Sequence, residues 1–346
     1  MAEQSSIALG LMGADSSGPA SLAQVIAEVE QQAASGAAER LRPLATGFSP
    51  LDEVLNGGIK PGELVVLGGP FGVGKTIMGL QIARNAVVRD AGARALYVCY
   101  EHDRAHLFSR LLCLESAEQG YSDEALTLRR LADWSLDPKG GGVIARLRTM
   151  PSQAAVLRTM SAYSERLILA KASGTYSTLE QIHEWVQAAN SAGRLLLVVD
   201  YLQKIPLAHD LIEPEAEATT FLTQGLKELA MSAGIQVLAI AAADRAGLKT
   251  KRMRLSDLRG SSALQYEADV GLVLNNKFAI VSREHMVYNL SQAEAMRNWV
   301  VLTVEKNRAG RTAVDMEYAL DAVHFRMVST GDFVRERLVD ERVILA

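Results

Sequence analysis

Residues 65–79 read VVLGGPFGVGKTIMG, and this stretch decides the fold. An apolar run typical of a buried strand leads into four glycines within seven positions, and Lys75 and Thr76 follow the last glycine directly. From Gly69 onward the residues fit the pattern G-x-x-x-x-G-K-T, placed between a strand and a helix as a phosphate-binding loop requires. Glycines allow successive backbone amides to converge on phosphate oxygens, where a Cβ would collide or forbid the torsion angles.

This loop predicts a site for ATP with Mg²⁺. The helix amino terminus adds partial positive charge, the Lys75 ammonium serves the outer phosphates, and the Thr76 hydroxyl can ligate the metal ion. The alternative is a chance glycine-rich turn, which the complete pattern in its strand–loop–helix context disfavours. The residues predicted to bind the nucleotide are Gly69, Gly72, Val73, Gly74, Lys75, Thr76, Ile77 and Asp200.

Two acidic residues follow apolar runs: Asp200 follows LLLVV and Glu101 follows ALYVCY. A carboxylate at the carboxyl end of a parallel strand lies beside the phosphate loop, so Asp200 is predicted to ligate Mg²⁺ together with Thr76. Hydrolysis also needs a group that orients water, and Glu101 is our candidate because Asp103 is better placed to cap the next helix. We expect the strand before Glu101 to neighbour the phosphate-loop strand. Read singly, each acid could instead cap the segment that follows it.

Composition limits the remaining possibilities. The chain has 346 residues, a formal net charge of −4 and a pI of about 5.9, so nucleic acid could be bound only at a local basic patch. Cys99 and Cys113 lie in apolar surroundings, which predicts buried thiols rather than a disulfide or a metal site. No apolar run approaches a membrane span, and the first residues do not resemble a signal peptide. A cytoplasmic protein is therefore expected.

Apolar runs alternate with helical segments from Leu44 onward, which predicts a doubly wound α/β domain with a mostly parallel sheet. Helices are predicted from Thr76 to about Asp90, from a capping box at Ser177 to about Gly193, and over about 216–233. Beyond Trp299 the pattern changes to antiparallel strands that close one edge of the sheet. The predicted parallel strands are 63–68, 95–100, 167–170, 195–199, 235–241 and 269–274.

The same reading divides the chain into regions. Residues 1–20 are predicted to be a disordered tail, 21–43 an amphipathic helix and a linker, 44–330 the α/β domain and 331–346 a carboxyl-terminal tail. The apolar stripe of the amino-terminal helix packs either on its own domain or on a neighbouring subunit. Within the domain, residues 139–165 form an excursion with helical pieces and no evident role.

The order of five segments resembles the RecA-like ATPase domain of DnaB-type replicative helicases. The resemblance spans roughly residues 22–328 and rests on TGFSPLDEVLNGGIKPGELVVLGGPFGVGKT, ALYVCYEHDRAHLFSRLL, LLLVVDYLQ, LSDLRGSSALQYEADVGLVL and VEKNRAG. It implies a RecA-like P-loop fold, ATP hydrolysis with Mg²⁺, action on single-stranded DNA during DNA replication, and a hexameric ring. It also implies that the helix at 21–34 docks on a neighbouring subunit. The family's amino-terminal domain, which binds primase, has no counterpart in these residues.

The resemblance also implies roles for single residues. Glu101 resembles the catalytic glutamate and Asp200 the acidic Walker B residue, while Lys306 and Arg308 resemble a Lys-x-Arg pair that reaches the γ-phosphate bound by the adjoining subunit. A solvated basic turn is the alternative reading of that pair. The chain departs from the family at Ala242, where a glutamine usually senses the γ-phosphate and a methyl group cannot. It departs again at His102, where an apolar residue is usual; we expect His102 to be exposed.

Two loops are candidates for contact with DNA. The loop over 204–218 is acidic and unsuited to a phosphate backbone. The loop over 245–257 has five cations within ten residues and is predicted to follow a single strand by charge, since neither loop contains aromatic residues for stacking. A flexible, solvated basic loop is the alternative. The predicted DNA contacts are Lys249, Lys251, Arg252 and Arg254, with Arg245 at the start of the loop.

Three functions remain open at this point. The motif order favours an ATP-dependent DNA helicase or translocase. A non-motor RecA-like ATPase, regulatory or scaffolding, that uses ATP to assemble a ring or a helical filament is the main alternative. A recombination mediator similar to the RadA group is the third possibility, and the Tyr-Leu-Gln sequence after Asp200 disfavours it.

Overall fold

The computed structural model describes residues 18–120, 124–137, 141–190, 194–207, 215–244, 247–281, 294 and 296–339. The chain divides into two compact units, Met1–Arg42 and Pro43–Ala346. Of the tail that the sequence predicts at residues 1–20, the first 17 residues lie outside the described residues. Residues 208–214 of the acidic loop at 204–218 and Arg245 of the basic loop also lie outside them.

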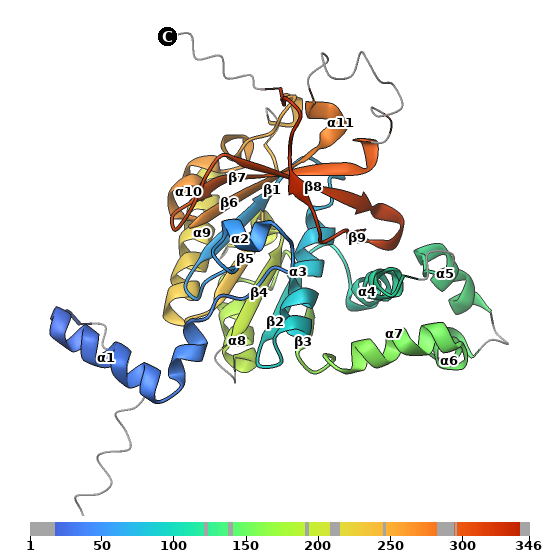
Figure 1. Ribbon diagram of the computed structural model, residues 1–346, viewed down its shortest axis with the longest axis horizontal. Helices are drawn as coiled ribbons and strands as arrows, with labels where there is room; N and C mark the ends of the chain where they lie inside the picture. The colour runs from blue at the N-terminus through green and yellow to red at the C-terminus, as the bar shows by residue number, and fades with distance from the viewer. Residues whose placement is uncertain are drawn as a thin grey trace, which may run out of the picture. The chain divides into compact units, whose positions relative to one another are not determined.

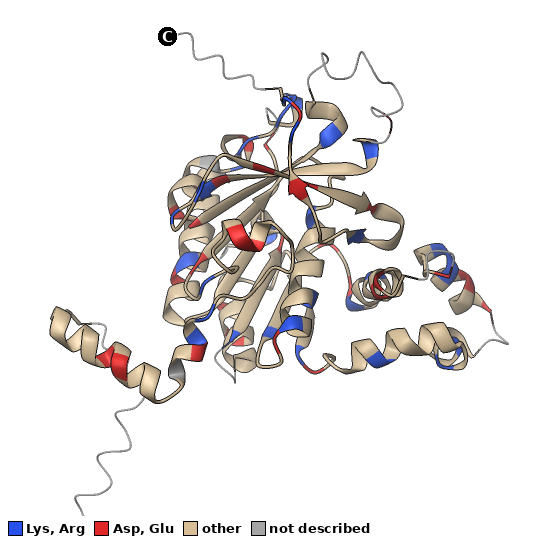
Figure 2. Cartoon of the chain, viewed as in Figure 1, with Lys and Arg blue, Asp and Glu red and all other residues tan. Residues whose placement is uncertain are grey.

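The first unit contains the helix α1 (Leu22–Ala34) and the short 3₁₀ helix η1 (Ala37–Leu41). Ser21 caps α1, because its hydroxyl accepts from the Gln24 N–H while the Gln24 side chain accepts from the Ser21 N–H. The helix has acidic residues but no lysine or arginine (Figure 2). Its apolar stripe is exposed, at 41–75% for each member, and consists of Leu22, Val25, Ile26 and Val29.

The second unit is built on one sheet, with ten strands among the described residues. Six strands run parallel, as the sequence predicts, and their bounds are β1 (Leu64–Gly68), β2 (Arg94–Cys99), β3 (Leu167–Lys171), β4 (Leu195–Asp200), β5 (Gln236–Ile240) and β6 (Val270–Asn276). The antiparallel strands are β7 (Trp299–Asn307), β8 (Val314–Asp321), β9 (Arg326–Met327) and β10 (Asp332–Phe333). The order is β10-β8-β7-β6-β1-β5-β4-β2-β3, with β9 also paired to β8. This confirms the doubly wound α/β sheet with antiparallel edge strands (Figure 1).

Helices cover both faces of this sheet and supply the short connections around it (Figure 1). The excursion between β2 and β3 is helical, as predicted. The helices are α2 (Leu51–Val54), α3 (Lys75–Arg89), α4 (Arg104–Glu118), α5 (Leu128–Leu136), α6 (Gly142–Thr149), α7 (Pro151–Ser161), α8 (Leu179–Ala189), α9 (Glu215–Ser232), α10 (Ser261–Glu267) and α11 (Lys277–Ile280). The 3₁₀ helices are η2 (Leu202–Lys204), η3 (Gly247–Lys249), η4 (Leu255–Asp257), η5 (Met296–Asn298) and η6 (Ala322–His324).

The start of α8 differs from the prediction. Thr178, not Ser177, is its cap, and the Thr178 hydroxyl accepts from the Gln181 N–H. Ser177 is not available for capping because its hydroxyl accepts a hydrogen bond from the Ser173 N–H at 3.0 Å. The helix therefore begins one residue later than the sequence pattern indicates.

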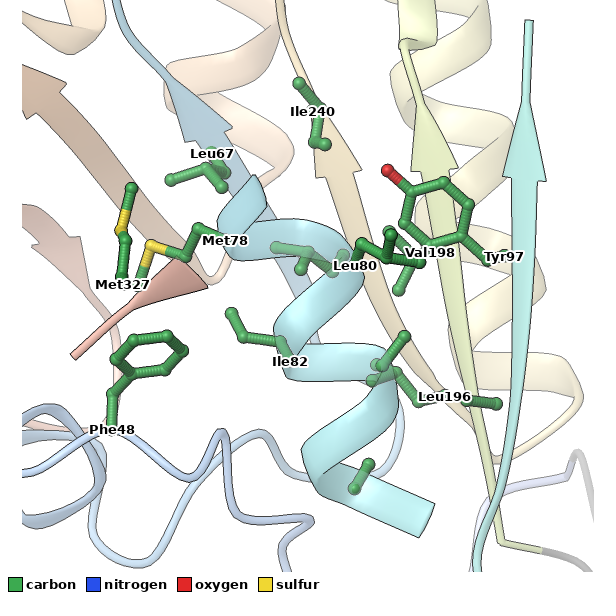
Figure 3. Close-up of a cluster of buried hydrophobic side chains, with 14 of the residues drawn as sticks. Phe48, Leu67, Met78, Leu80, Ile82, Tyr97, Leu196, Val198, Ile240 and Met327 are labelled. Carbon is green, nitrogen blue, oxygen red and sulfur yellow. The ribbon is translucent and has the colours of Figure 1, made fainter. Parts of the chain in front are cut away.

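Alternate residues of the central strands pack into two separate cores. Leu67, Leu196, Val198 and Ile240 pack beneath α3, and Figure 3 shows their side chains around Leu80 and Ile82. The intervening strand residues face α8 and α9 in the second core. Strands buried on both faces explain why their sequences are continuous apolar runs rather than alternating ones. The two cysteines, Cys99 and Cys113, are free and buried, as predicted.

The pairing of β6 with β7 contains an irregularity. Leu272 pairs with Val304 but Gly271 pairs with Lys306, so Glu305 is one extra residue on β7. Such a bulge bends the strand and changes the direction of the side chains beyond it. The Glu305 carboxylate is held by the Arg254 side chain and the Leu255 N–H.

Residues 331–339, which we expected to belong to a tail, pair with the domain. Strand β10 pairs with β8, and Leu338 bridges to Val281. Lys277 is buried and its ammonium contacts the carboxylates of Glu317 and Glu336. These contacts extend the folded unit beyond the predicted limit at residue 330. None of the helices in the described ranges is long and apolar enough to cross a bilayer.

Candidate functional site

The phosphate-binding loop opens one side of a cavity of about 310 Å³. The cavity lies at the carboxyl ends of the parallel strands, where ligands bind in open α/β sheets. Of the predicted nucleotide-binding residues, Gly69 and Val73 are part of the loop without lining the cavity. The lining residues that the sequence analysis singled out are Gly72, Gly74, Lys75, Thr76, Ile77, Glu101, His102, Asp200 and Ala242.

The loop has the backbone geometry that the glycines permit. Gly69 and Gly74 have φ values of 150° and 99°, in a region that other residues rarely adopt. A Cβ on Gly74 would lie 2.6 Å from the Met327 methyl group, and one on Gly69 would lie 2.6 Å from the Leu274 carbonyl oxygen. The loop is therefore closely packed against β6 and β9 on one side. Its other side lines the cavity.

Lys75 begins α3 and turns its side chain back over the loop. Its ammonium donates to the carbonyl oxygens of Gly69 at 2.8 Å and Pro70 at 2.9 Å. Burial lowers the pKa of Lys75, and the nearby charges of Asp200 and Glu101 oppose that shift. A partly desolvated ammonium in this position interacts strongly with any anion that enters the cavity.

Asp200 ends β4 and is 2% exposed. One carboxylate oxygen, Oδ2, accepts a hydrogen bond of 2.7 Å from the Tyr97 hydroxyl. Burial raises the pKa of Asp200, whereas hydrogen bonds from Tyr97 and Thr76 lower it. The contact with Thr76 brings a hydroxyl and a carboxylate together, which are the oxygen donors that Mg²⁺ prefers.

Glu101 follows β2 and lines the cavity. The prediction that its strand lies next to the phosphate-loop strand β1 is wrong. The order β1-β5-β4-β2 places two strands between the phosphate loop and Glu101. Glu101 reaches the same cavity because the carboxyl ends of parallel strands lie along one edge of a sheet. Its side chain is exposed, which leaves the carboxylate free of the helix cap. Asp103 supplies that cap, accepting from the His106 N–H at 2.8 Å.

Ala242 lies where the resemblance would place a glutamine, and it is one of the residues that line the cavity. Its amide donates to the side-chain oxygen of Gln203 at 3.0 Å, and Gln203 in turn donates to the Arg259 carbonyl. Gln203 comes from the Tyr-Leu-Gln sequence after Asp200. Its carboxamide thus ties the end of β5 to the segment that precedes α10.

A cluster of cationic and aromatic side chains closes another part of the cavity, and the sequence analysis missed it. His102 is half-buried rather than exposed, because Arg110 lies 3.0 Å from its Nε2 atom. Arg110 also donates to His106 and packs on the Phe325 ring. Part of the signal was in the sequence: His106 and Arg110 are four residues apart and share one face of α4, whereas His102 lies in the turn before the Asp103 cap.

Lys306 and Arg308 lie at the amino-terminal ends of the parallel strands, whereas the phosphate loop lies at their carboxyl ends. Strand β7 is antiparallel to β6, so Asn307 pairs with Val270, which pairs with Val65 near the start of β1. The phosphate loop follows the other end of β1, and each residue of a strand adds about 3.3 Å. The two cations therefore cannot reach the phosphate loop of their own chain.

Both side chains contact the carboxyl end of α10, and Arg308 also contacts Asp269, the residue before β6. The Lys306 ammonium donates to the carbonyl oxygens of Gln265 and Tyr266. The Arg308 guanidinium pairs with Asp269 at 3.1 Å and is half exposed. Burial and the charge of Arg308 lower the pKa of Lys306.

The predicted DNA contacts do not form one group. Lys249 is exposed at the end of η3 and Lys251 is exposed just beyond it. Arg252 is buried instead, since its guanidinium binds Asp315 and Thr303. Arg254 pairs with Glu305 at 3.0 Å. The geometry thus separates two solvent-facing lysines from two arginines that bind the sheet.

Residues 43–327 match the family described as the DnaB-like helicase C terminal domain. The chain belongs to this family. Among similar proteins, the replicative DNA helicase DnaB of Treponema pallidum (strain Nichols) is 28% identical over 236 residues, which are 67% of this chain and 48% of that protein. The DnaB of Mycoplasma pneumoniae (strain ATCC 29342 / M129 / Subtype 1) is 27% identical over 301 residues, 83% of this chain and 57% of that protein. The chain spans about half the length of the curated relatives that it matches.

Solved structures show the same RecA-like helicase ATPase fold as this DnaB-like domain. One of them, described as an ATPase domain, superposes with a TM-score of 0.69 at 18% identity, covering 90% of this chain and 99% of that chain. "The Structure Of A DnaB-Like Replicative Helicase And Its Interactions With Primase" has a TM-score of 0.65 at 18% identity, covering 90% and 67%. The DNA repair protein RadA of Mycobacterium tuberculosis (strain ATCC 25618 / H37Rv) is 39% identical, but over 87 residues.

Proposed function

We propose that this chain binds and hydrolyses ATP and uses the energy as a DNA helicase that moves along single-stranded DNA. The observation that carries the proposal is one cavity lined by Lys75, Thr76, Glu101 and Asp200. These are the groups that phosphoryl transfer to water requires: a phosphate cradle, a metal site and a carboxylate that orients water. Relatives named as replicative DNA helicases favour a helicase over other ATPases.

Mg²⁺ fits this cavity as the ion bound with ATP. Thr76 and Asp200 supply one hydroxyl and one buried carboxylate. The described residues contain no group of three or more His, Cys, Asp or Glu side chains that could hold a metal ion. Phosphate oxygens and water would supply the other ligands, as is usual for Mg²⁺. The ion would neutralise charge on the phosphates, while Glu101 accepts a hydrogen bond from the attacking water.

Completion of this site requires a second copy of the chain. Lys306 and Arg308 lie too far from their own phosphate loop, so they serve the nucleotide of an adjoining subunit. A cation supplied across an interface stabilises the charge of the transition state and couples hydrolysis to assembly. The exposed apolar stripe of α1 provides a second contact between copies, and we propose a hexameric ring. The free, buried cysteines support a cytoplasmic location.

Single-stranded DNA would contact the basic loop through Lys249 and Lys251. Their exposure leaves both ammonium groups available to phosphates. Arg252 and Arg254 would instead hold the loop on β7 and β8 through Asp315 and Glu305. Binding by point charges without aromatic stacking would be sensitive to salt and insensitive to sequence.

The test measures ATP hydrolysis with and without single-stranded DNA, followed by separation of a forked duplex. We expect ATP binding in a calorimeter with Mg²⁺, turnover that DNA stimulates, and strand separation. Lys75→Ala should abolish both nucleotide binding and turnover. Turnover that ignores DNA, with no strand separation, would contradict the helicase and favour a non-motor RecA-like ATPase.

A further inference from the structure

Arg110 lies in the cavity without a carboxylate bonded to it. It is half-buried on α4, and its guanidinium packs 4.8 Å from the centre of the Phe325 ring. Nε donates to Nε2 of His106 at 3.0 Å, and Nη2 lies 3.0 Å from Nε2 of His102. Within the described part of the chain, no other hydrogen bond or ion pair of this guanidinium is found. A cation fixed on three sides thus keeps its remaining N–H groups for the cavity.

The two histidines can hold Arg110 only as neutral acceptors. A guanidinium has donors and no acceptor, so each imidazole must accept at Nε2 and have its proton at Nδ1. The two rings stack, with centroids 4.5 Å apart and an angle of 27° between their planes. Burial, followed by the charge of Arg110, lowers the pKa of both His102 and His106. The neutral form that the geometry needs is therefore the form that the surroundings favour.

Arg110 lines the same cavity as Lys75, Glu101 and Asp200. The negative charges of Asp200 and Glu101 both act on its pKa, which burial lowers. Glu101 is adjacent in sequence to His102, so the water-orienting carboxylate and the histidine that holds Arg110 lie on one turn. Ala242 lines the same cavity and offers no hydrogen bond from its side chain. A donor that responds to the outer phosphate must therefore come from another residue.

We propose that His102 and His106 are positioning residues that hold Arg110 against the outermost phosphate of ATP in the same subunit. This inference rests on the proposed ATPase function and adds to it a cation in cis, distinct from the pair at the opposite edge of the sheet. The histidines contact Arg110 and not the nucleotide. Arg110 is the group that contacts the phosphate and distinguishes ATP from ADP, in place of the amide that Ala242 lacks.

The arrangement also predicts sensitivity to acid. Protonation of either imidazole removes an acceptor and places a second positive charge beside Arg110, which releases the guanidinium. The charges of Glu101 and Asp103 favour the protonated imidazole of His102, whereas burial and Arg110 oppose it. The charged and titratable groups that act on the cluster are Tyr97, Cys99, Glu101, Asp103 and Asp200. On the segment that contributes the Phe325 ring, Asp321 pairs with His324 and Arg326.

The experiment compares four variants and one control variant of the full chain with the unaltered chain. His102→Leu/His106→Leu removes both acceptors, and His102→Gln/His106→Gln keeps an acceptor near each Nε2 position without a group that titrates. Arg110→Ala removes the cation itself, and a triple variant combines Arg110→Ala with both leucines. His183→Leu, on an exposed face of α8, is the matched control. The readouts are kcat and KM for ATP, the affinities for ATP and ADP with Mg²⁺, and kcat as a function of pH.

We expect the leucine pair to lower kcat by about tenfold to a hundredfold, the usual effect of a misplaced catalytic group. The affinity of the leucine pair for ADP should stay within about twofold of that of the unaltered chain, because Arg110 contacts only the phosphate that ADP lacks. The glutamine pair should keep most of kcat and lose the decline that the unaltered chain shows as the pH falls below the ordinary histidine pKa of about 6.5. The triple variant should be no slower than Arg110→Ala, because the histidines act through that residue.

Three results would overturn the inference. One is a folded leucine pair that hydrolyses ATP as fast as the unaltered chain. Another is a triple variant that is clearly slower than Arg110→Ala, which would show a separate structural role. The third is an identical pH profile for the glutamine pair and the unaltered chain, a comparison that holds even if the leucine pair fails to fold. If the unaltered chain itself does not hydrolyse ATP, the proposed function fails together with this inference.

Discussion

The Tyr97 hydroxyl donates a hydrogen bond of 2.7 Å to Oδ2 of Asp200, across the adjacent strands β2 and β4. Tyr97 is fully buried and Asp200 is 2% exposed, so water does not compete for this bond. The bond fixes one carboxylate oxygen at the edge of the cavity. A carboxylate that must be buried before it can bind a metal ion is costly to the fold until the ion arrives.

We predict that Asp200→Asn stabilises the fold and abolishes ATP hydrolysis. Burial raises the pKa of Asp200 above its unfolded value, so ionisation costs stability at neutral pH; that cost decreases as the pH falls below the folded pKa and is gone below the unfolded pKa. Asparagine keeps the acceptor for Tyr97 without the charge. The free energy of unfolding at pH 7 should rise by about 0.5–2 kcal/mol, and the gain should shrink toward about pH 4. Denaturant titrations at the two pH values measure it, and a loss of stability at pH 7 would contradict the prediction.

Arg308 and Lys75 are predicted to serve one nucleotide from two different subunits. Arg308→Ala should lower ATP turnover by about a thousandfold, as loss of an arginine finger does, and Lys75→Ala should abolish it. A mixture of the two variants should recover part of the activity, because some interfaces then combine an intact loop with an intact arginine. The measurement is turnover of mixed assemblies, with co-assembly verified by light scattering. Co-assembled variants that remain inactive would place Arg308 outside the adjoining site.

Lys249 and Lys251 are predicted to contact the phosphates of single-stranded DNA. Removing both charges should reduce the dependence of log K on log salt by about 1.4, at about 0.7 for each phosphate contact on single strands. Fluorescence titration of a labelled oligonucleotide at several salt concentrations gives this slope. The matched control is Arg297→Ala/Arg335→Ala, which removes two exposed cations elsewhere. If both double variants change the slope equally, the effect comes from net charge and not from contacts of Lys249 and Lys251 with DNA.

Arg252 is predicted to act in stability rather than in DNA binding. Its guanidinium is 6% exposed and pairs with Asp315, and its Nη2 donates to Thr303. Arg252→Ala removes the ion pair, leaves that carboxylate with only the hydrogen bond from the Thr303 hydroxyl, and should cost about 3 kcal/mol of the free energy of unfolding. Thermal and urea unfolding measure this loss, with Lys251→Ala as the neighbouring exposed control. A variant as stable as the unaltered chain would return Arg252 to the group of candidate DNA contacts.

Local patterns were sufficient for most of the fold. The phosphate loop and the six parallel strands were predictable, since glycine spacing and apolar runs are properties of a few adjacent residues. The neighbour of β2 was not, because strand order depends on which crossover passes over which strand. The residues near Glu101 contain no signal that β5 and β4 lie between its strand and β1.

The site was predictable where its chemistry is carried by a motif, and the rest depended on distant partners. Arg252 and Arg254 were predicted to be free loop cations. Their partners Asp315 and Glu305 are more than 50 residues away along the chain, so no local pattern shows the pairing. His102 was predicted to be exposed because a histidine is not expected to have a cation as its partner. Arg110 is that partner, and it packs on Phe325, which comes from the far end of the domain. A search for polar residues four apart on one helix face would have found His106 and Arg110 but not His102, which precedes α4.

The extra residue Glu305 places two consecutive side chains of β7 on one face of the sheet. Lys306 pairs with Gly271 and lies on the same face as a Gly271 side chain would, which is the face it would also have in a strand without the bulge. The additional position allows Glu305 to bind Arg254 and the Leu255 N–H while Lys306 contacts the end of α10. Deletion of Glu305 would therefore detach the basic loop from β7 while leaving Lys306 on its present face.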